Sequence, residues 1–205
     1  MKSTKTHFVF LLAFVFALGC AADSKNEKSQ EPTYAEYMAN SKAVRGLAFK
    51  DYVRLTNLQP KDTTALINTW KLWEAENWAE LNSYIYKNGL NDSFPTAQGF
   101  VNVEVVSLKV GDSIDRYNSI YGQFFAPKGA PFGGRSLPDT DRYHPYTAYV
   151  VTKQIDSVLK GKAIPWYGEP GLGTQFMTRK HDIELLKEGY LQMTDSIGPT
   201  TPPAN

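Results

Sequence analysis

The stretch GFVNVEV, residues 99–105, marks a change from helical to strand-like sequence along this chain. Its three valines alternate with polar residues, and this period of two is typical of a half-buried β-strand. A second alternating run covers residues 149–153, and glycine and proline interrupt the segments in between. A helix is expected near residues 181–188, ended by Gly189. The pattern predicts a strand-rich second half that carries one late helix.

The region before this point, residues 33–98, is helical in character because Ala, Glu, Lys and Leu are frequent in it. Asp62 is expected to cap a helix ahead of an amphipathic stretch that contains Trp70, Trp73 and Trp78. Three tryptophans so close together suggest either an aromatic ligand site or a packed core. Aromatic residues at helical spacing usually pack against a neighbouring element, so we favour the core. The whole chain is therefore assigned to the α+β class.

Length and composition limit what the protein can do. The chain has 205 residues, of which 42% are hydrophobic and 21% charged, so it is expected to bury a core within about one ordinary domain. The net charge is +1, from 22 basic and 21 acidic residues, and loss of Lys2 and Lys5 with a cleaved leader would make it −1. A nucleic-acid partner that is recognised through phosphate neutralisation is therefore not expected. The single cysteine excludes an internal disulfide framework and any multi-cysteine metal site.

The first twenty residues have the features of an export signal. Two lysines precede an unbroken apolar run over residues 8–18, which is shorter than the roughly 20 residues that a membrane-spanning helix needs. The sequence Ala17-Leu18-Gly19-Cys20 resembles the lipobox of bacterial lipoproteins, in which the cysteine becomes the acylated first residue. The alternative is an ordinary signal-peptidase site, which the same small residues would satisfy. Residues 21–32 are polar and unpatterned, as expected of a flexible tether, and residues 196–205 are expected to form a loose tail.

Several common catalytic signatures are missing from the sequence. It contains no G-x-S-x-G elbow, H-E-x-x-H pair, Walker loop or G-x-G-x-x-G motif. Beyond the leader only His144 and His181 remain, so a three-histidine zinc site is impossible and no metal is expected. Thiol catalysis is not expected either, because the only cysteine lies at the cleavage site.

Polar and turn-forming residues concentrate instead in four segments of the second half: residues 115–127, 129–138, 143–146 and 165–176. An arginine fork can bind two phosphate oxygens, and a glycine-rich turn lets backbone amides approach an anion. Taken alone, an arginine in a strand such as Arg116 is more often a solvated or salt-bridged surface residue. A histidine beside a proline, such as His144, is more often a capped loop histidine than a catalyst. No single segment identifies a function.

Together, in this order and spacing, the segments resemble the TNT (tuberculosis necrotizing toxin) domain family, whose members hydrolyse NAD⁺ and often NADP⁺. The resemblance covers residues 105–195. It is carried in turn by DRY (115–117), GQF (122–124), GAPF (129–132), RSLP (135–138), YH (143–144), PWYG (165–168), PGLGTQF (170–176) and GYL (189–191). The resemblance implies that residues 99–195 form a small, mostly antiparallel β-rich domain that ends in a helix. Residues 33–98 show no recognised counterpart.

The same resemblance implies a set of site residues. Arg116 would clamp the pyrophosphate, Gln175 would orient water or the ribose, and His144 would complete the catalytic group. Further substrate contacts are implied for Arg135, Phe124, Tyr167, Gly173 and Thr174. Alternation along the strand that holds Gln175 would turn its two neighbours to the opposite face. No cofactor or metal is implied, because NAD⁺ or NADP⁺ is consumed as the substrate.

This sequence departs from the family pattern at four positions. Phe124 replaces an expected tyrosine, Leu172 and Asn118 replace usual glycines, and Glu169 replaces a usual glutamine. Arg116 and Gln175 are both kept, which favours an active enzyme that releases nicotinamide and ADP-ribose. The alternative is a catalytically silent lipoprotein that binds a nucleotide or a partner on the same scaffold.

The expected partners and location follow from these two resemblances. NAD(P)⁺ is the expected small-molecule partner, and the toxin family implies a neutralising immunity protein. The lipobox implies attachment to a membrane through Cys20, at the outer membrane or cell surface, whereas ordinary cleavage of the signal would release the protein.

Overall fold

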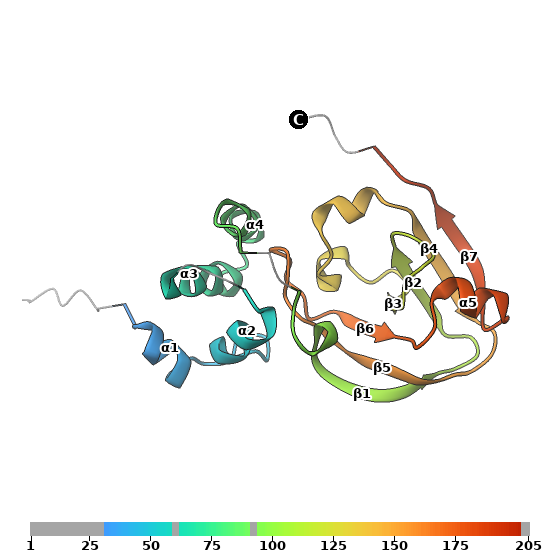
Figure 1. Cartoon of the computed structure of the whole chain (residues 1–205), viewed down its shortest axis with the longest axis horizontal. Helices are drawn as coiled ribbons and strands as arrows, with labels where there is room; N and C mark the ends of the chain where they lie inside the picture. The colour runs from blue at the N-terminus through green and yellow to red at the C-terminus, as the bar shows by residue number, and fades with distance from the viewer. Residues whose placement is uncertain (1–30, 59–61, 91–93, 202–205) are drawn as a thin grey trace, which may run out of the picture. The chain divides into compact units, whose positions relative to one another are not determined.

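The computed structural model describes residues 31–58, 62–90 and 94–201 (Figure 1). The leader, Cys20 and nearly all of the tether lie outside the described residues, so their assignments remain predictions. Among the described residues, none of the helices has the length and apolar character needed to cross a bilayer. The described residues from Pro32 to Thr201 belong to one compact unit.

The first part of this unit is helical, as the sequence predicts. The helices are α1 (Tyr34–Asn40), α2 (Phe49–Thr56), α3 (Thr63–Glu74) and α4 (Trp78–Lys87). Asp62 caps α3 as expected, because its side chain accepts a hydrogen bond from the Ala65 backbone N–H at 3.1 Å. The predicted amphipathic stretch is divided between α3 and α4, and Trp78 begins the second of them.

Two of the three tryptophans form the centre of a core, which confirms the packing interpretation. Trp70 and Trp73 are 1% and 0% exposed, and their ring centroids are 5.2 Å apart in a stacked arrangement. Trp78 is only partly buried, and the Arg45 guanidinium lies 5.3 Å from its ring centroid. Burial of such large aromatic surfaces contributes a major share of the stability of a small helical unit.

The second part is one antiparallel sheet, so the α+β prediction is confirmed. Within the described residues the sheet has seven strands in the order β1-β5-β6-β3-β2-β4-β7. Their bounds are β1 (Phe100–Leu108), β2 (Ser113–Tyr117), β3 (Phe124–Pro127), β4 (Tyr146–Val151), β5 (Ile155–Ala163), β6 (Thr174–Met177) and β7 (Leu191–Ile197). Three short 3₁₀ turns, η1 (Ala97–Gly99), η2 (Phe132–Arg135) and η3 (Asp139–Tyr143), precede β1 or connect β3 to β4.

The late helix is α5 (Asp182–Lys187), and the chain leaves it at Gly189, whose φ is 71°. Two strand boundaries differ from the sequence prediction. β4 ends at Val151 rather than at residue 153, since the chain turns there and the Thr152 N–H donates to the Tyr190 carbonyl. The loose tail is predicted to start at residue 196, but β7 continues to Ile197, which pairs with Tyr146 of β4.

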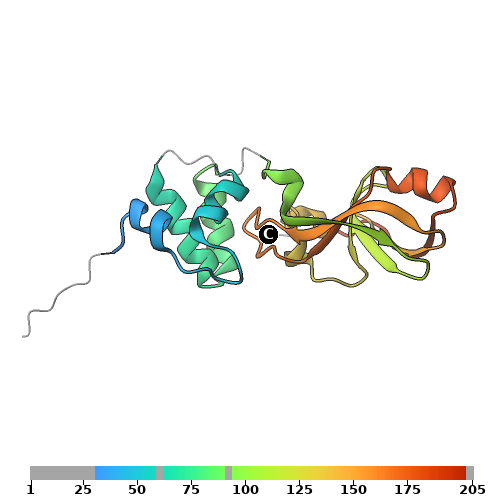
Figure 2. The same ribbon diagram turned by 90° about the horizontal axis from the view of Figure 1, so that it is seen from below.

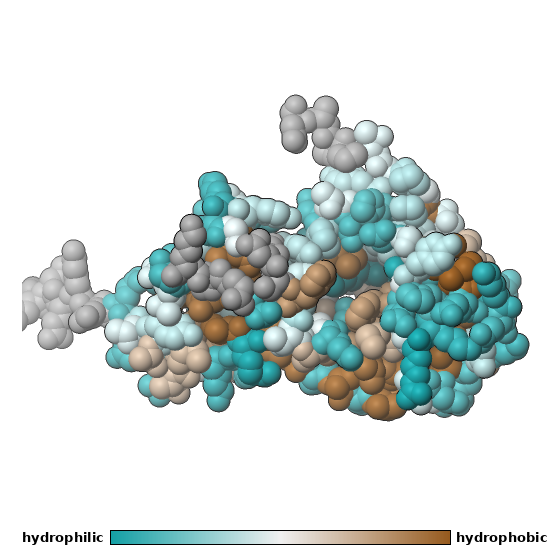
Figure 3. Space-filling view, in the orientation of Figure 1, coloured by the Kyte–Doolittle hydropathy of each residue, from teal (hydrophilic) through white to brown (hydrophobic). Residues whose placement is uncertain are grey.

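A second core lies between α5 and the sheet. Leu185 from α5 joins Ile114, Tyr149 and Val158, and Figure 2 shows α5 lying against the sheet. The outermost strand β1 instead exposes Val103 and Val105, and Figure 3 shows apolar side chains gathered along this strand. Strand pairing and α5 thus fix the backbone of β2, β3 and β6, which carry the residues considered next.

Candidate active site

A cavity of about 310 Å³ opens where β2, β3 and β6 carry the family motifs. Its walls include Arg116 from β2, Phe124 from β3, and Thr174 and Gln175 from β6. A larger, more apolar hollow of about 510 Å³ adjoins it and shares Phe124, Arg135, Leu137 and Gln175 with it. The structure therefore brings five of the predicted residues to one cleft: Arg116, Phe124, Arg135, Thr174 and Gln175.

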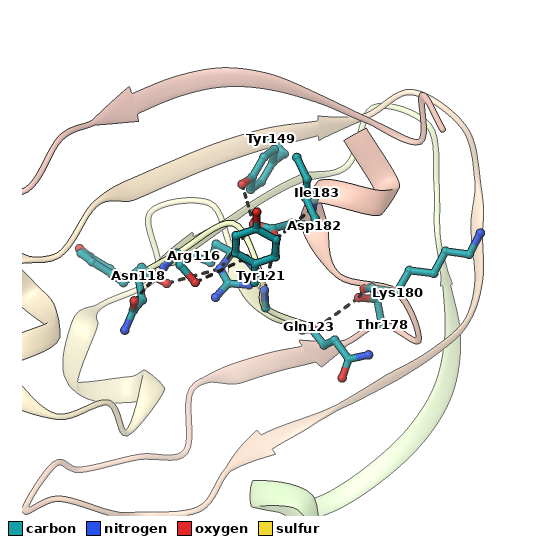
Figure 4. Close-up of polar contacts among 12 residues, drawn as sticks. Arg116, Asn118, Tyr121, Gln123, Tyr149, Thr178, Lys180, Asp182 and Ile183 are labelled. Atoms are coloured by element: carbon teal, nitrogen blue, oxygen red, sulfur yellow. Dashed lines mark hydrogen bonds and ion pairs between the residues drawn. The ribbon is translucent and has the colours of Figure 1, made fainter. Parts of the chain in front are cut away.

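Arg116 is a buried cleft residue and not a surface arginine. Its side chain is 11% exposed, and its Nε lies 3.7 Å from the Asp182 Oδ2 (Figure 4). Burial lowers the pKa of the guanidinium, and the negative charge of Asp182 opposes that shift. The Nη1 atom is buried without a hydrogen-bond partner among the described residues. A buried donor left in this way is suited to an anionic ligand.

Gln175 lies on β6 between the two hollows and lines both of them. Its strand is held on both sides, by Gly161 of β5 opposite Gln175 and by β3 on the other edge. Phe176 packs against the second core, as strand alternation predicts. Thr174 does not follow the prediction, because it lines the cleft together with Gln175 at the point where β6 begins.

Arg135 contributes to the cleft wall mainly by holding it together. Its Nη1 is 2.5 Å from the Asp115 Oδ1, and its Nη2 donates to the Ala130 carbonyl at 2.9 Å. Asp115 is fully buried, and its other oxygen accepts hydrogen bonds from the Gly129 N–H and the Tyr146 hydroxyl. Burial and this contact with Asp115 raise the pKa of Tyr146 to about 12. The guanidinium of Arg135 is thus already occupied by the protein itself.

The larger hollow has apolar walls with isolated polar atoms set among them. Phe124 is 44% exposed and faces both hollows, and Trp166, Ile164 and Met177 line the larger one. The Trp166 Nε1 is buried without a hydrogen-bond partner among the residues that the structure describes. An apolar pocket with a few unpaired polar groups is the usual form of a small-molecule site.

Three predicted site residues do not line this cleft: His144, Tyr167 and Gly173. His144 lines a neighbouring hollow, where its Nδ1 is 3.0 Å from the Asp141 Oδ1 and its side chain is 45% exposed. Tyr167 lines a small space beside the helices, together with Tyr52 and Leu81. The structure does not bring either side chain to the walls that hold Arg116 and Gln175.

The glycine-rich turn before β6 has close backbone contacts. The Gly173 N–H donates to the Gly134 carbonyl at 2.9 Å, and a Cβ atom on Gly173 would lie 2.5 Å from that oxygen. Gly173 therefore acts through its small size, by letting the turn approach η2. Leu172, at a usual glycine position, adopts the left-handed conformation with φ 62° and packs against the helical core.

Sequence reasoning missed several cleft residues. Phe94, Pro95 and Gln98 line the larger hollow although they precede the recognised segment. Asp182 also escaped notice, because an acidic residue at the start of a helix is explained equally well by the helix dipole. Only the fold brings these residues beside the motif residues.

Comparison with known proteins agrees with this arrangement. Residues 107–194 match the model of the family described as tuberculosis necrotizing toxin. The family resemblance predicted for residues 105–195 is thus confirmed, and the match covers the sheet residues that form the cleft.

One curated relative is the conidial surface nicotinamide adenine dinucleotide glycohydrolase nadA of Aspergillus fumigatus. It is 43% identical over 96 residues, which are 43% of this chain and 41% of the relative, so the chain spans less than half of the relative's length. Among solved structures, tuberculosis necrotizing toxin complexed with its immunity factor is similar at a TM-score of 0.45 and 18% identity, over 81% of this chain and 96% of that one. A second, Rhs1-CT in complex with its cognate immunity protein, gives a TM-score of 0.37 and 19% identity, over 52% and 88%.

Proposed function

We propose that this protein is an NAD(P)⁺ glycohydrolase that cleaves the bond between nicotinamide and ribose. The observation that carries the proposal is the position of Arg116 and Gln175, which come from different strands and line one cavity. The match of residues 107–194 to the toxin family supports the same reaction, and so does the glycohydrolase activity in the name of the fungal relative.

The two hollows suit the two kinds of surface that a dinucleotide presents. Arg116 lines the smaller hollow, where its positive charge suits the pyrophosphate. The apolar walls around Phe124 and Trp166 offer a surface to a flat ring in the larger one. Their volumes of about 310 and 510 Å³ fall within the range typical of ligand pockets.

The reaction needs little acid catalysis from the protein. The leaving group departs from a cationic pyridinium ring as neutral nicotinamide, taking the electron pair of the broken C–N bond. The ribosyl carbon develops oxocarbenium character, as in glycosidases, and a water oxygen forms the new bond and releases a proton. The products are nicotinamide, ADP-ribose and H⁺.

Gln175 suits the step in which water attacks. Its amide does not titrate and does not compete with water as a nucleophile, yet it can accept and donate hydrogen bonds. Held on β6 at the junction of the hollows, it lies where a ribose would connect a pyrophosphate to a nicotinamide ring. We assign it the role of orienting the water or the ribose hydroxyls. The mechanism uses no cofactor or metal, and NADP⁺ is a second candidate substrate.

Incubation of the purified chain with NAD⁺ tests the proposal. Chromatography should show nicotinamide and ADP-ribose appearing in equal amounts, and the Arg116→Ala variant should form them far more slowly. Tyr84→Phe is a matched control, because it removes a hydroxyl that accepts from Asn68 in the helical region, away from the cleft. A wild-type protein that binds NAD⁺ without releasing nicotinamide would support the silent binding protein instead.

We further propose that the protein is exported and attached to a membrane through a lipid on Cys20, with an immunity protein protecting the producing cell. The lipobox-like sequence before Cys20 supports the anchor, and the surface location in the fungal relative's name supports export. Fractionation of cells that express wild type or Cys20→Ser tests the anchor. The wild-type protein should sediment with membranes and the variant should not, and equal partition of the two would contradict lipidation.

A further inference from the structure

Asp182 contacts Arg116 and is not one of the residues that line the cleft. It is fully buried at the start of α5, and its Oδ2 lies 3.7 Å from the Arg116 Nε. The Tyr149 hydroxyl donates to the same oxygen at 2.9 Å (Figure 4). Burial and the negative charge of Asp182 raise the pKa of Tyr149, so its hydroxyl stays protonated and remains a donor.

The other oxygen of Asp182 is also occupied. Its Oδ1 accepts hydrogen bonds from the Gly122 N–H at 3.3 Å and the Ile183 N–H at 3.0 Å. The Asp182 N–H in turn donates to the Gly122 carbonyl at 3.0 Å. The carboxylate is therefore fixed in one orientation by partners on β4, on α5 and on the loop that leads to β3.

Gly122 provides the space that the Arg116 guanidinium occupies. A Cβ atom on Gly122 would lie 1.6 Å from the Arg116 Nη1, and its three nearest atoms would all belong to that guanidinium. The backbone of Gly122 has no positive φ, so the position needs glycine for its small size and not for its conformation. Any side chain here would displace the arginine.

The charge of Arg116 is only partly compensated within the protein. Its ion pair with Asp182 spans 3.7 Å, and its Nε donates to the Tyr117 carbonyl at 3.4 Å. Its Nη1 has no hydrogen-bond partner among the described residues. A buried cation with so few partners is costly in the absence of a ligand, and a diphosphate would supply the missing partners. The arrangement keeps the guanidinium in place and leaves its charge only partly compensated.

We propose that Asp182 is a positioning residue for Arg116, that Tyr149 and Gly122 fix it in this role, and that the three together aim the guanidinium at the substrate's diphosphate. The proposal rests on the function proposed above. It adds Asp182 and Tyr149, which lie outside the family motifs, and gives a role to Gly122 of the GQF segment. The competing explanation is that Asp182 only fastens α5 to the loop that contains Gly122. That explanation predicts changes in stability that do not depend on Arg116.

A double-mutant cycle separates the two explanations, with ADP-ribose as the probe and calorimetry as the measurement. Tyr149→Phe removes one hydroxyl and keeps a ring that makes an edge contact with Phe125. It should weaken ADP-ribose binding by roughly 5- to 10-fold, which is less than the effect of losing a direct hydrogen bond to a charged group, because Tyr149 acts through Asp182. In an Arg116→Ala background the same change should have no further effect, because the residue through which it acts is gone. The control variant Tyr84→Phe also loses one tyrosine hydroxyl, but in the helical region, and it should bind ADP-ribose with wild-type affinity.

Gly122→Ala gives a second cycle that does not depend on how well Tyr149→Phe folds. It should weaken ADP-ribose binding by about 10-fold or more in the wild-type background, and by less than about 2-fold with Arg116→Ala, where the added methyl meets no guanidinium. Equal losses in both backgrounds, or no binding of ADP-ribose to wild type, would contradict the positioning role. Nicotinamide release by the wild-type protein is measured in parallel. If the losses of ADP-ribose binding are coupled but the wild type releases no nicotinamide, only the proposed reaction is wrong. If nicotinamide is released but the losses of binding are additive, only the positioning role is wrong.

Discussion

Arg135 and Asp115 form a buried ion pair in the wall of the cleft, with 2.5 Å between the Arg135 Nη1 and the Asp115 Oδ1. The side chains of the two residues are 7% and 0% exposed. Both come from segments of the family motif, and the sequence alone suggested that Arg135 touches the substrate. The pair shows that part of the motif serves to build the cleft.

Asp115→Asn should therefore destabilise the fold strongly. It would leave the Arg135 charge buried without its partner, which typically costs about 3–5 kcal/mol. Thermal or urea unfolding measures the loss. Glu104→Gln is the matched control, because it breaks an exposed pair with Lys160 and should change stability by less than about 1 kcal/mol. Similar losses in both variants would contradict a structural role for the buried pair.

Arg116→Lys separates the contribution of the planar guanidinium group from that of the positive charge. Lysine keeps the positive charge but loses the planar group that can donate to two phosphate oxygens. NAD⁺ turnover at subsaturating substrate should fall by about 10-fold or more, while the melting temperature stays within a few degrees of wild type. A fully active variant would remove Arg116 from substrate binding.

Glu169 makes the stability depend on pH. Burial raises the pKa of this carboxyl, and its ion pair with Arg142 at 3.1 Å opposes the shift only in part. A raised pKa in the folded state means that the contribution of Glu169 is fully present below its ordinary value of 4.5 and is lost as the pH rises through the folded-state pKa. Glutamine at position 169 cannot ionise. The melting temperature of Glu169→Gln relative to that of wild type should therefore be higher at pH 7 than at pH 4. Melting temperatures at the two pH values test this, and an improvement for wild type relative to the variant would contradict it.

Trp73 connects the helical region to the glycine-rich turn. Its indole N–H donates to the Pro170 carbonyl at 3.1 Å, two residues before Leu172, which packs on the same helical core. Trp73→Phe should cost about 2 kcal/mol, from lost buried surface and one unsatisfied carbonyl. Hydrogen exchange should also rise at the Gly171 and Gly173 amides, which are both hydrogen-bonded in the turn. Unchanged exchange at these amides would show that the contact does not stabilise the turn.

Local patterns predicted the elements that short-range forces determine. The spacing of Trp70 and Trp73 predicted a packed core, Asp62 predicted the start of α3, and Gly189 predicted the end of α5. The family motifs placed Arg116 and Gln175 together, because strand pairing brings them to one cavity. The class of the fold and the centre of the cleft were therefore accessible from the sequence.

The remaining features depend on contacts between distant parts of the chain. Asp182 lies far along the chain from Arg116, and its position at the start of a helix gave no sign of that contact. Tyr167 belongs to a motif segment, but the turn directs its side chain to a space beside the helices. Leu172 departs from the family pattern in sequence, and its side chain packs on the helical core, for which the family pattern has no recognised counterpart.

Gln175 is expected to take part directly in cleaving the nicotinamide–ribose bond. The most direct measurement is nicotinamide release from NAD⁺ by wild type and Gln175→Ala, with binding of ADP-ribose and thermal unfolding followed on the same proteins. We predict that kcat falls by about 10²–10³, which is the usual effect of losing one well-placed polar group in the transition state. Affinity and melting temperature should change little, because the interaction is made mainly in the transition state. Normal turnover by Gln175→Ala, with or without a loss of stability of about 1 kcal/mol, would contradict the mechanism.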